Sequence, residues 1–510
     1  MKIIQRLFTR LVTISIAILL QILFFLFIIV YIGRMFPFFY ICFVGFSVLI
    51  VIWIGMKNDN PAYKLTWVTL ILMAPLVGGV VYLLWGNKRL PRKTRRALEH
   101  FTATSLEYKV QDRTALESLE KADKDLAVTA RYLDDIAGFP LWMGTEAEYF
   151  STGEKMFTRL KEELAKAKSY IFMEYFIVEE GHMWDPILAL LRKKIASGVE
   201  VYFMYDDIGC INTLPKNYDR KLASEGFRVQ VVNPFRPRLN PAMNYRDHRK
   251  ITVIDGKVAF CGGLNLADEY INERERFGHW KDTAVMIEGQ AVWNLTQAFI
   301  RMWNFTCSNQ KDYLDEGAYR HTIGDARNDG YVQPFSDTPL DFENVSENFF
   351  LNVINHATDY IYITTPYLVI DHEMQTALCL AAKNGVDVHL ITPGIPDKKT
   401  IFKLTRSYYL PLLEAGVKIS EYTPGFIHAK NLVVDDNVAL VGTINMDYRS
   451  FYFHYECGVA FYRCGVIRAV KEDFHHTLRH SREITYAAAK KVPLYERVIR
   501  SILRLFAPLL

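Results

Sequence analysis

The sequence predicts an α/β fold in which one lobe occurs twice, behind an apolar N-terminal region. Strands alternate with helices from residue 141 onward, a pattern typical of α/β sandwiches with a mostly parallel sheet. The same order of elements returns between residues 326 and 490. Internal repetition on this scale indicates a duplicated unit. We therefore expect two α/β/α sandwich lobes in one chain.

The composition argues against several classes of protein. The chain has 510 residues, enough for two domains and additional segments, and 50% of them are hydrophobic. A net charge of +4 is too small to indicate nucleic-acid binding by itself. The seven cysteines form no CxxC pair, so neither a disulfide framework nor a zinc site is indicated. We expect reduced cysteines in a protein that faces the cytosol.

Three apolar segments occupy the first 86 residues, at about 11–33, 36–56 and 65–86. Each lacks charged residues and has about 20 residues or more, the length that a helix needs to cross a bilayer. The first segment is too long for a signal peptide and is followed at once by another apolar segment. These features predict a multi-pass protein of the cell membrane.

Basic residues on both sides of these segments bear on the orientation. They are Lys2, Arg6 and Arg10 before the segments, and Lys88, Arg89, Arg92, Lys93, Arg95 and Arg96 after them. The larger group is expected to stay in the cytoplasm, which places the catalytic part of the chain there. Two cytoplasmic ends require an even number of spans. The number of spans and the side of the N-terminus therefore stay open.

The rest of the chain divides into a connector, two lobes and a tail. The connector, residues 87–140, is charged and helix-like, most clearly at 115–135. The first lobe is expected at 141–325, with helices at 155–168, 184–197 and 218–224 and strands at 170–178, 199–205 and 227–232. The second lobe is expected at 326–490, with helices at 342–356, 374–383 and 401–413 and strands at 360–365, 386–391 and 417–421.

The tail, residues 491–510, is predicted to form an amphipathic helix. Arg497, Arg500 and Arg504 share one side at helical spacing, and leucines and Phe506 add apolar surface. Two interpretations stay open. The helix packs on the catalytic body, or it lies in the interface of a membrane.

One polar pattern occurs once in each lobe with the same spacing. It reads H-x-K-x4-D-x6-G-[GT]-x-N, and it begins at His248 and again 180 residues later at His428. A single His-x-Lys pair carries little information, whereas two copies of so long a pattern indicate function. Its polar members are His248, Lys250, Asp255 and Asn265 in the first copy, and His428, Lys430, Asp435 and Asn445 in the second.

Strand periodicity places these side chains on defined faces. His248 and Lys250 lie two residues apart and share a face of their strand, whereas Asp255 falls on the opposite face. An Asp-Gly pair at 255 and 256 predicts a tight turn, after which the chain returns and brings Asn265 near the histidine. The second copy is equivalent. We therefore assign Asp255 and Asp435 to turn and scaffold.

The remaining residue types suit a phosphoryl group. A lysine neutralises phosphate oxygens, and an asparagine donates hydrogen bonds as charge builds in the transition state. Two histidines can share the work, because one can attack phosphorus while the other protonates the leaving oxygen. A phospho-histidine also lets an alcohol replace water as the second acceptor. No acidic cluster indicates a two-metal site, so we expect neither a metal nor another cofactor.

The two motifs resemble the paired HKD motifs of the phospholipase D superfamily. With the apolar segments included, nearly the whole chain is similar to the bacterial cardiolipin synthases of that superfamily. The further stretches that carry this similarity are Asn60-Pro61, 75–86, 279–282, 365–367 and 442–450. The resemblance implies two phospholipase D-like lobes that share one active site.

The same resemblance implies a reaction and its residues. A phosphatidylglycerol is attacked at phosphorus, glycerol leaves, a phosphatidyl-histidine forms, and a second phosphatidylglycerol takes up the phosphatidyl group to give cardiolipin. The N-terminal histidine is usually the nucleophile in the superfamily, which favours His248, with His428 as acid and then base; the residues alone do not choose. The HKD motifs supply the catalytic set of His248, Lys250, Asp255, His428, Lys430 and Asp435, with Asn265 and Asn445 as phosphate-binding residues.

Members of the family also orient each histidine with a carboxylate some thirty residues downstream. Asp282 lies 34 residues after His248, and Glu456 lies 28 after His428. We expect each carboxylate to hold the histidine that precedes it in the chain. Two further residues are notable: Glu174, an acid in an apolar strand, needs a partner if it is buried, and Tyr367 is expected in the core, with the pocket as the alternative.

Other functions remain to be weighed. The motifs also fit a phospholipase D or a phosphatidyltransferase that uses another alcohol, such as serine or ethanolamine. A membrane-tethered nuclease would need a strongly basic body, whereas residues 100–490 are near charge balance. A non-catalytic scaffold would have no use for two intact motifs. The expected partners are therefore phosphatidylglycerol and membrane lipid rather than nucleic acid, and nothing predicts an oligomeric state.

Overall fold

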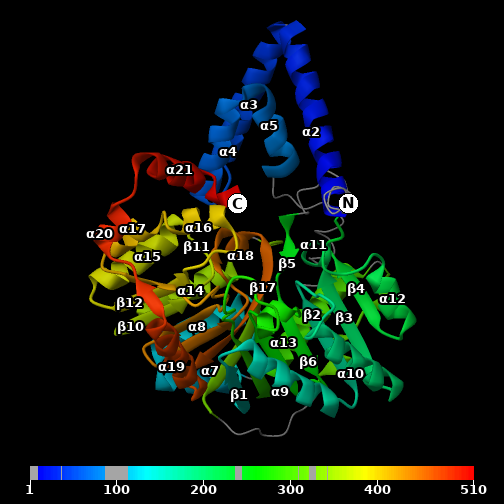
Figure 1. Ribbon diagram of the computed structural model, residues 1–510. Helices are drawn as coiled ribbons and strands as arrows, with labels where there is room; N and C mark the ends of the chain where they lie inside the picture. Colours follow the sequence, from blue (N-terminus) through cyan, green and yellow to red (C-terminus); the bar gives the residue numbers. More distant parts are fainter. Residues whose placement is uncertain are drawn as a thin grey trace.

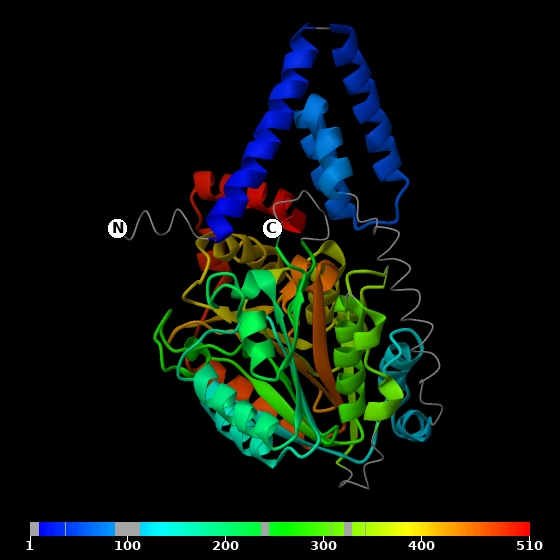
Figure 2. The ribbon, with the colours of Figure 1, turned by 90° about the vertical axis from the view of Figure 1, so that its right-hand side faces the viewer.

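Two lobes, each built around a mixed β-sheet, lie side by side beneath a projecting pair of N-terminal helices (Figures 1 and 2). The computed structural model describes residues 10–35, 37–86, 113–235, 244–307, 309–320, 329–341 and 343–509. The basic group at 88–96 and the two basic residues at positions 2 and 6 lie outside the described residues. The orientation that they predict therefore stays a prediction.

The first lobe contains a seven-stranded sheet with the order β1-β8-β7-β6-β2-β3-β4. Strands β2, β3 and β4 run parallel, and the other pairs are antiparallel. The strands are β1 (Thr145–Phe150), β2 (Tyr170–Tyr175), β3 (Glu200–Asp206), β4 (Arg228–Val232), β6 (Lys250–Ile254), β7 (Val258–Gly262) and β8 (Ala284–Gly289).

The second lobe contains a nine-stranded sheet with the order β18-β13-β12-β10-β14-β15-β17-β5, and β9 also pairs with β17. A separate two-stranded ribbon joins β11 (Leu368–Val369) to β16 (Met446–Asp447). The strands of the large sheet are β5 (Arg246–Asp247), β9 (Tyr331–Asp337), β10 (Tyr360–Thr364), β12 (Asp387–Pro393), β13 (Lys418–Tyr422), β14 (Asn431–Val434), β15 (Val438–Gly442), β17 (His454–Tyr462) and β18 (Ser481–Glu483).

The two sheets repeat one plan, which confirms the predicted duplication. The parallel run β2-β3-β4 corresponds to β10-β12-β13, and the hairpin β6-β7 corresponds to β14-β15. The expectation of mostly parallel sheets was wrong. Each polar motif folds as an antiparallel hairpin and is followed by another antiparallel strand, β8 or β17, so antiparallel pairs outnumber parallel pairs in both sheets.

The helices of the first lobe match the predicted ones closely. Apolar periodicity and glycine stops explain the agreement; for example, Gly198 has a positive φ of 92° just after the end of α10. Phe299 of α13 stacks on Phe172 of β2 with 4.4 Å between ring centroids. The helices are α9 (Gly153–Lys166), α10 (Trp184–Ala196), α11 (Asp207–Cys210), α12 (Tyr218–Ser224), η3 (Asp268–Ile271), α13 (Val292–Thr306), η4 (Gln310–Asp312) and η5 (Glu316–Tyr319).

Two predicted helices are each divided in the structure. The segment at 401–413 forms α16 and α17, because Pro411 has no backbone N–H and fits only the first turn of a new helix. The connector forms α7 and α8, because the Asp123 carboxylate caps α8.

The helices of the connector, the second lobe and the tail are α7 (Thr114–Ala122), α8 (Lys124–Asp135), α14 (Val345–His356), α15 (His372–Lys383), α16 (Lys399–Thr405), α17 (Tyr409–Glu414), α18 (Tyr448–Tyr452), α19 (Val466–Arg479), α20 (Tyr486–Lys490), α21 (Leu494–Leu505) and η6 (Ala507–Leu509).

The apolar N-terminal region forms α2 (Arg10–Met35), α3 (Pro37–Gly55), α4 (Pro61–Met73), α5 (Pro75–Val81) and the π-turn η1 (Tyr82–Gly86). Among the described residues, no helix combines the length and the apolar character needed to cross a membrane. The structure therefore does not support the prediction of three membrane-spanning helices. In the third segment Ala74 leaves helical geometry and Pro75 starts a new helix, so α4 reaches only about 20 Å against a hydrocarbon layer of about 30 Å.

Backbone pairing across the lobes joins the two polar motifs. Strand β5 runs parallel to the start of β17, and the backbone N–H of His248 donates to the Tyr455 carbonyl at 3.0 Å. On the other side, Lys281 donates to the Phe426 carbonyl at 3.0 Å, and His428 donates to the Lys281 carbonyl at 2.7 Å. Each motif thus begins on a strand that is hydrogen-bonded to the opposite lobe.

The motif aspartates lie at the hairpin turns, with φ of 51° at Asp255 and 52° at Asp435. The Asp255 carboxylate accepts hydrogen bonds from the backbone N–H groups of Lys168, Ser169 and Tyr170 at 2.7–2.9 Å. Asp435 accepts the equivalent bonds from residues 358, 359 and 360 at 2.7–3.0 Å. Each aspartate therefore ties its hairpin to the start of the neighbouring central strand.

We predict that Asp255→Ala and Asp435→Ala lower stability rather than catalysis. Each change leaves three backbone N–H groups without their carboxylate acceptor, which is expected to lower the free energy of unfolding by about 1–3 kcal/mol. Thermal unfolding and activity per folded molecule are the measurements, with the exposed Glu288→Gln on β8 as control. A loss of turnover at unchanged stability would contradict the scaffold role.

Candidate active site

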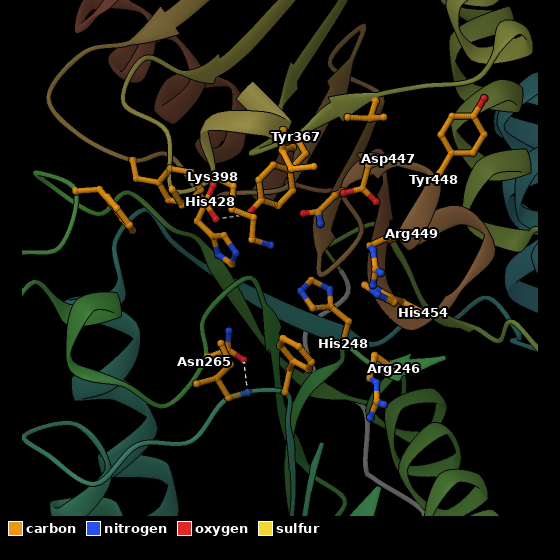
Figure 3. Close-up of a pocket in the computed structure, with 18 of the residues that line it drawn as sticks. Arg246, His248, Asn265, Tyr367, Lys398, His428, Asp447, Tyr448, Arg449 and His454 are labelled. Atoms are coloured by element: carbon orange, nitrogen blue, oxygen red, sulfur yellow. Dashed lines mark hydrogen bonds between the residues drawn. The ribbon is translucent and has the colours of Figure 1, made fainter. Parts of the chain in front are cut away.

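A cavity of about 650 Å³ lies between the lobes, and both motif histidines line it (Figure 3). Its wall also contains Asn265, Asn445 and Tyr367. The structure thus brings residues from positions 180 apart in the chain to one site. Tyr367, which we expected in the core with the pocket as the alternative, packs against the core of the first lobe and also lies in the cavity wall, where its hydroxyl donates to Asp397 at 2.5 Å.

His248 is buried, and a carboxylate holds its ring. The Nδ1 atom lies 2.9 Å and 3.1 Å from the two carboxylate oxygens of Glu456. Glu456 is fully buried and also accepts hydrogen bonds from the hydroxyl of Ser450, at 2.7 Å, and from that of Thr443. A carboxylate at Nδ1 favours the tautomer with hydrogen on Nδ1 and leaves Nε2 with a lone pair for attack.

His428 is held in the same manner. Its Nδ1 lies 2.6 Å from a carboxylate oxygen of Asp282, which is fully buried. Burial opposes the charged form of Asp282, but His428 and Lys430 outweigh it and hold the pKa of this carboxyl below its usual value. Asp282 therefore stays an acceptor that can stabilise a protonated imidazole on His428.

The pairing crosses between the lobes, and our expectation of pairing within each lobe was wrong. Glu456 of the second lobe holds His248, and Asp282 of the first lobe holds His428. The inter-lobe backbone pairs explain the exchange, because they align the residue before each carboxylate with the opposite histidine. Spacing along the chain could not reveal this arrangement.

The position of the motif that is Gly263 in the first copy and Thr443 in the second lies next to these carboxylates. A Cβ atom built on Gly263 would meet an Asp282 oxygen at 2.1 Å, so the first copy needs glycine there. In the second copy Thr443 occupies this position, and its hydroxyl donates to Glu456. The pattern therefore has Gly263 where the Asp282 carboxylate needs space, and Thr443 where a hydroxyl donates to Glu456.

The two motif lysines lie beside the histidines. Lys250 Nζ donates to the His248 carbonyl at 2.5 Å, and Lys430 Nζ donates to the His428 carbonyl. Burial lowers the pKa of Lys250 to about 8, opposed by Glu456. Burial likewise lowers the pKa of Lys430 to about 7, opposed by Asp282. Both lysines are thus buried beside the motif histidines, behind the residues that line the cavity.

Burial and the lysines also act on the imidazoles. Burial, followed by Lys430, lowers the pKa of His428 to about 4 although Asp282 opposes the shift. Burial, followed by Lys250 and Lys430, holds the pKa of His248 well below its usual value. Both rings are therefore neutral at neutral pH in the empty site. A neutral ring is the form that can attack phosphorus or accept a proton from an alcohol.

Asn265 and Asn445 lie in the cavity wall, and some of their polar atoms form hydrogen bonds within the protein. Asn265 accepts from the backbone N–H of Ile177 at 2.9 Å and donates to the Tyr270 hydroxyl at 2.7 Å. The buried Oδ1 of Asn445 has no hydrogen-bond partner among the described residues. Their expected role in holding phosphate stays a prediction.

Two other expectations concern residues outside the cavity wall. Asp255 and Asp435, included in the catalytic set by resemblance, lie at the hairpin turns and bind backbone N–H groups, so the structure corrects that assignment. Glu174 has the partner that its burial demanded, because Arg249 Nη2 lies 2.5 Å from its carboxylate. This buried pair supports the central strand behind the motif.

Sequence reasoning missed His454, Arg246 and Arg449, which all line the cavity. His454 lies two residues before Glu456 in β17, so strand alternation could have placed both side chains on one face. Among the described residues, His248, His454 and Glu456 form one group that could hold a metal ion, with ligand atoms within 4.8 Å of one another. In this structure His248 and Glu456 are instead bonded to each other.

Comparison with known proteins identifies the family. A family model described as "Cardiolipin synthase, PLD-like domain" matches residues 160–303 and 350–478, and one described as "Phospholipase_D-nuclease N-terminal" matches residues 45–87. A cardiolipin synthase of Halalkalibacterium halodurans is 34% identical over 478 residues, which covers 91% of this chain and 94% of that protein. The chain belongs to the cardiolipin synthase family.

Two further similarities extend the comparison. An uncharacterized protein of Streptococcus mutans is 44% identical to this member of the cardiolipin synthase family, over 88% of this chain and 96% of its own length. The crystal structure of phosphatidylserine synthase from Haemophilus influenzae Rd KW20 superposes with a TM-score of 0.57 at 16% identity, over 75% of this chain and 97% of that chain. The second similarity is one of fold alone, and it confirms the two phospholipase D-like lobes.

We predict that the two crossed carboxylates affect the half-reactions differently. With His248 as nucleophile, Glu456→Gln should slow formation of the phospho-enzyme by about two to four orders of magnitude, because the ring loses its tautomer control. Asp282→Asn should instead slow both half-reactions, because His428 then loses its support as acid in the first step and as base in the second. Rapid-quench trapping with labelled phosphatidylglycerol measures both.

The exposed Glu472→Gln on α19 serves as the control for charge loss in the second lobe. The opposite result, in which Asp282→Asn slows formation alone and Glu456→Gln slows both half-reactions, would show that His428 is the nucleophile. The same pattern of effects in both variants would contradict separate roles for the two carboxylates.

Proposed function

We propose that this chain synthesises cardiolipin by transferring a phosphatidyl group from one phosphatidylglycerol to another, with release of glycerol. One observation carries the proposal: two buried histidines, each held by a carboxylate of the opposite lobe, line one cavity. Such a pair can supply a nucleophile and a proton donor on opposite sides of a phosphorus atom. Family membership supports the choice of substrate.

In the first half-reaction, Nε2 of His248 attacks the phosphorus of the donor lipid. The bond from phosphorus to the glycerol oxygen breaks, and this oxygen takes a proton from His428. Asp282 stabilises the protonated ring of His428, and Glu456 stabilises the ring of His248 as it becomes positively charged. The products are a phosphatidyl-histidine and free glycerol.

In the second half-reaction, the hydroxyl of a second phosphatidylglycerol replaces glycerol. Neutral His428 accepts the hydroxyl proton while the oxygen attacks phosphorus, and the bond between phosphorus and His248 breaks. In the empty site His428 is neutral, and the neutral ring is the form that accepts a proton. Its protonation for the first step requires the bound phosphate anion, whose negative charge raises the pKa of a neighbouring imidazole.

Lys250 and Lys430 stabilise the charge that develops on the phosphoryl oxygens. They are buried and already oriented by carbonyl contacts, so little reorganisation is needed during reaction. Asn265 and Asn445 line the same cavity, and we assign them additional hydrogen bonds to the phosphate. The chemistry of these side chains is complete without a metal ion in any step.

We propose that the protein acts at the bacterial cell membrane, with its catalytic lobes on the cytoplasmic side. The substrates are lipids, and the N-terminal helices α2 and α3 expose many large apolar side chains where they project from the lobes (Figure 2). Exposed apolar surface of this extent is typical of contact with lipid or protein. Examples are Leu20 at 60%, Phe24 at 62%, Phe27 at 66%, Phe38 at 72% and Ile41 at 68% exposure.

We predict that membranes containing the protein convert labelled phosphatidylglycerol alone into cardiolipin and free glycerol in equal amounts. Thin-layer chromatography of the lipids and an assay of released glycerol measure the two products. Membranes that contain the protein with both motif histidines replaced by alanine serve as the control.

Two other products would change the conclusion. Phosphatidic acid without cardiolipin would show hydrolysis, as in a phospholipase D. Formation of phosphatidylserine or phosphatidylethanolamine in preference to cardiolipin, when serine or ethanolamine is added, would assign a different acceptor alcohol.

A further inference from the structure

His454 is a buried imidazole in the cavity wall to which the mechanism above gives no task. Only 8% of the residue is exposed, and neither ring nitrogen has a hydrogen-bond partner within the described part of the chain. Its Nδ1 lies 3.6 Å from a Glu456 oxygen, which is too long for a hydrogen bond. Buried polar groups are almost always hydrogen-bonded, so this ring is expected to serve a bound group.

The position of His454 indicates which group it serves. Its ring centroid lies 5.4 Å from that of His248. In Figure 3, His454, Arg246 and Arg449 gather on one side of His248, whereas His428 lies on the other side. A phosphoryl group attached to His248 would therefore have the acid–base histidine on one flank and this imidazole with two guanidinium groups on the other.

The two arginines give this flank a positive character. Arg246 is buried, and its guanidinium lies 3.5 Å from Asp206 and donates to the Asn233 carbonyl at 2.9 Å. Arg449 donates to Asn244 at 3.2 Å. These contacts hold both guanidinium groups at the cavity wall, where they favour an anion over a neutral ligand.

Whichever tautomer it adopts, the His454 ring carries at least one N–H donor. We propose that His454 donates a hydrogen bond to an oxygen of the donor lipid's phosphodiester, on the flank of His248 that Arg246 and Arg449 make positive. It thereby positions phosphorus for attack by His248. This inference rests on the proposed phosphatidyl transfer and adds a substrate-binding residue to it.

The test compares His454→Phe, which keeps a flat ring without polar atoms, with His454→Asn, which keeps a donor and an acceptor. We expect His454→Phe to slow phospho-enzyme formation and raise the KM for phosphatidylglycerol by about 10- to 100-fold, the effect of one hydrogen bond to a charged group. His454→Asn should recover most of this loss. Rapid-quench trapping and steady-state kinetics in phosphatidylglycerol vesicles provide both values.

Equal losses in both variants would overturn the proposal. They would show that the polar atoms kept by His454→Asn do not restore activity, so that His454 does not act through a hydrogen bond. Unchanged formation of the phospho-enzyme in His454→Phe would overturn it as well. The first half-reaction is independent of the acceptor. A wild-type protein that yields phosphatidic acid would therefore refute cardiolipin synthesis and leave this test valid.

A second, independent inference concerns helix α21 near the C-terminus, which exposes an apolar face. None of its residues is buried, and several of its apolar side chains are exposed, with Leu494 at 75%, Tyr495 at 67% and Ile502 at 52% exposure. The Arg500 side chain is only 14% exposed; it donates to the Arg406 carbonyl at 3.4 Å and to Glu496 at 3.0 Å. Arg500 thus faces the protein, whereas these apolar side chains face outward.

The surroundings of α21 indicate what covers this face. The helix lies at the same end of the molecule as α2 and α3, next to the catalytic lobes (Figures 1 and 2). The Leu505 carbonyl accepts from Thr66 of α4 at 2.7 Å, and Ala507 of η6 forms part of the cavity wall. The exposed basic residues before the helix and on its surface are Lys490, Lys491, Arg497 and Arg504.

We propose that the outward face of α21, formed by Leu494, Tyr495, Val498, Ile499 and Ile502, lies on an anionic lipid surface. An apolar face with flanking basic residues is the pattern of an interfacial helix. Because α21 leads directly into the cavity wall, this contact brings the mouth of the active site to the lipids that it uses. The proposal commits to lipid rather than to a second copy of the chain.

The test combines Leu494→Ser, Val498→Ser and Ile502→Ser in one variant. Turnover in phosphatidylglycerol vesicles should fall at least about tenfold, while turnover of a short-chain phosphatidylglycerol dissolved below its micelle concentration stays within about twofold. A nitroxide quencher in the lipid head-group region should also quench a fluorophore placed at Tyr495→Cys in a Cys42→Ser background. The same label at Arg468→Cys on α19 is the control.

Equal loss with both substrates would show that α21 serves only the fold, and equal activity with both would show that the face has no role. Absence of quenching at position 495 would contradict lipid contact. A dimer that the triple variant converts to a monomer would assign the face to a second copy of the chain instead. Each of these results would overturn the proposal.

Discussion

The active site depends on backbone pairing between the two lobes. Strand β5 pairs with the start of β17, and Ile427 pairs with Lys281 in the equivalent place. These contacts put each catalytic carboxylate beside the histidine of the other lobe, so neither lobe by itself holds a complete pair. If the two lobes separated, both histidines would lose the carboxylate that fixes their tautomer.

Burial then determines the chemistry of the polar groups. Two imidazoles, two lysines and two carboxylates lie in one region that is nearly closed to solvent. Burial keeps the rings neutral, and one buried carboxylate holds each ring at Nδ1. Aromatic rings of Tyr270, Trp280 and Phe426 surround His428 with centroids 5.4–5.9 Å away. Aromatic rings packed in this way limit the access of water to His428.

Much of the architecture could be predicted because it follows from local pattern. Apolar runs bounded by glycine and polar turns placed the central strands to within a few residues, as at 170–178 for β2 and 360–365 for β10. Strand parity assigned Asp255 to the turn against the assignment that the resemblance implied. Two predictions about the fold were wrong. The motif hairpins pair antiparallel with their neighbours, and pairing between strands distant in sequence is not visible in a local pattern. The apolar segment at 65–86 forms two helices, the second of which begins at Pro75.

The sequence by itself determined that two equivalent hairpins each present a histidine, a lysine and an asparagine, because spacing along a strand fixes which side chains share a face. The tertiary structure alone decided which carboxylate serves which histidine. That choice depends on hydrogen bonds between strands of different lobes, and residue spacing carries no information about them. For the same reason, the unpartnered ring of His454 became visible only when the packing around it was known.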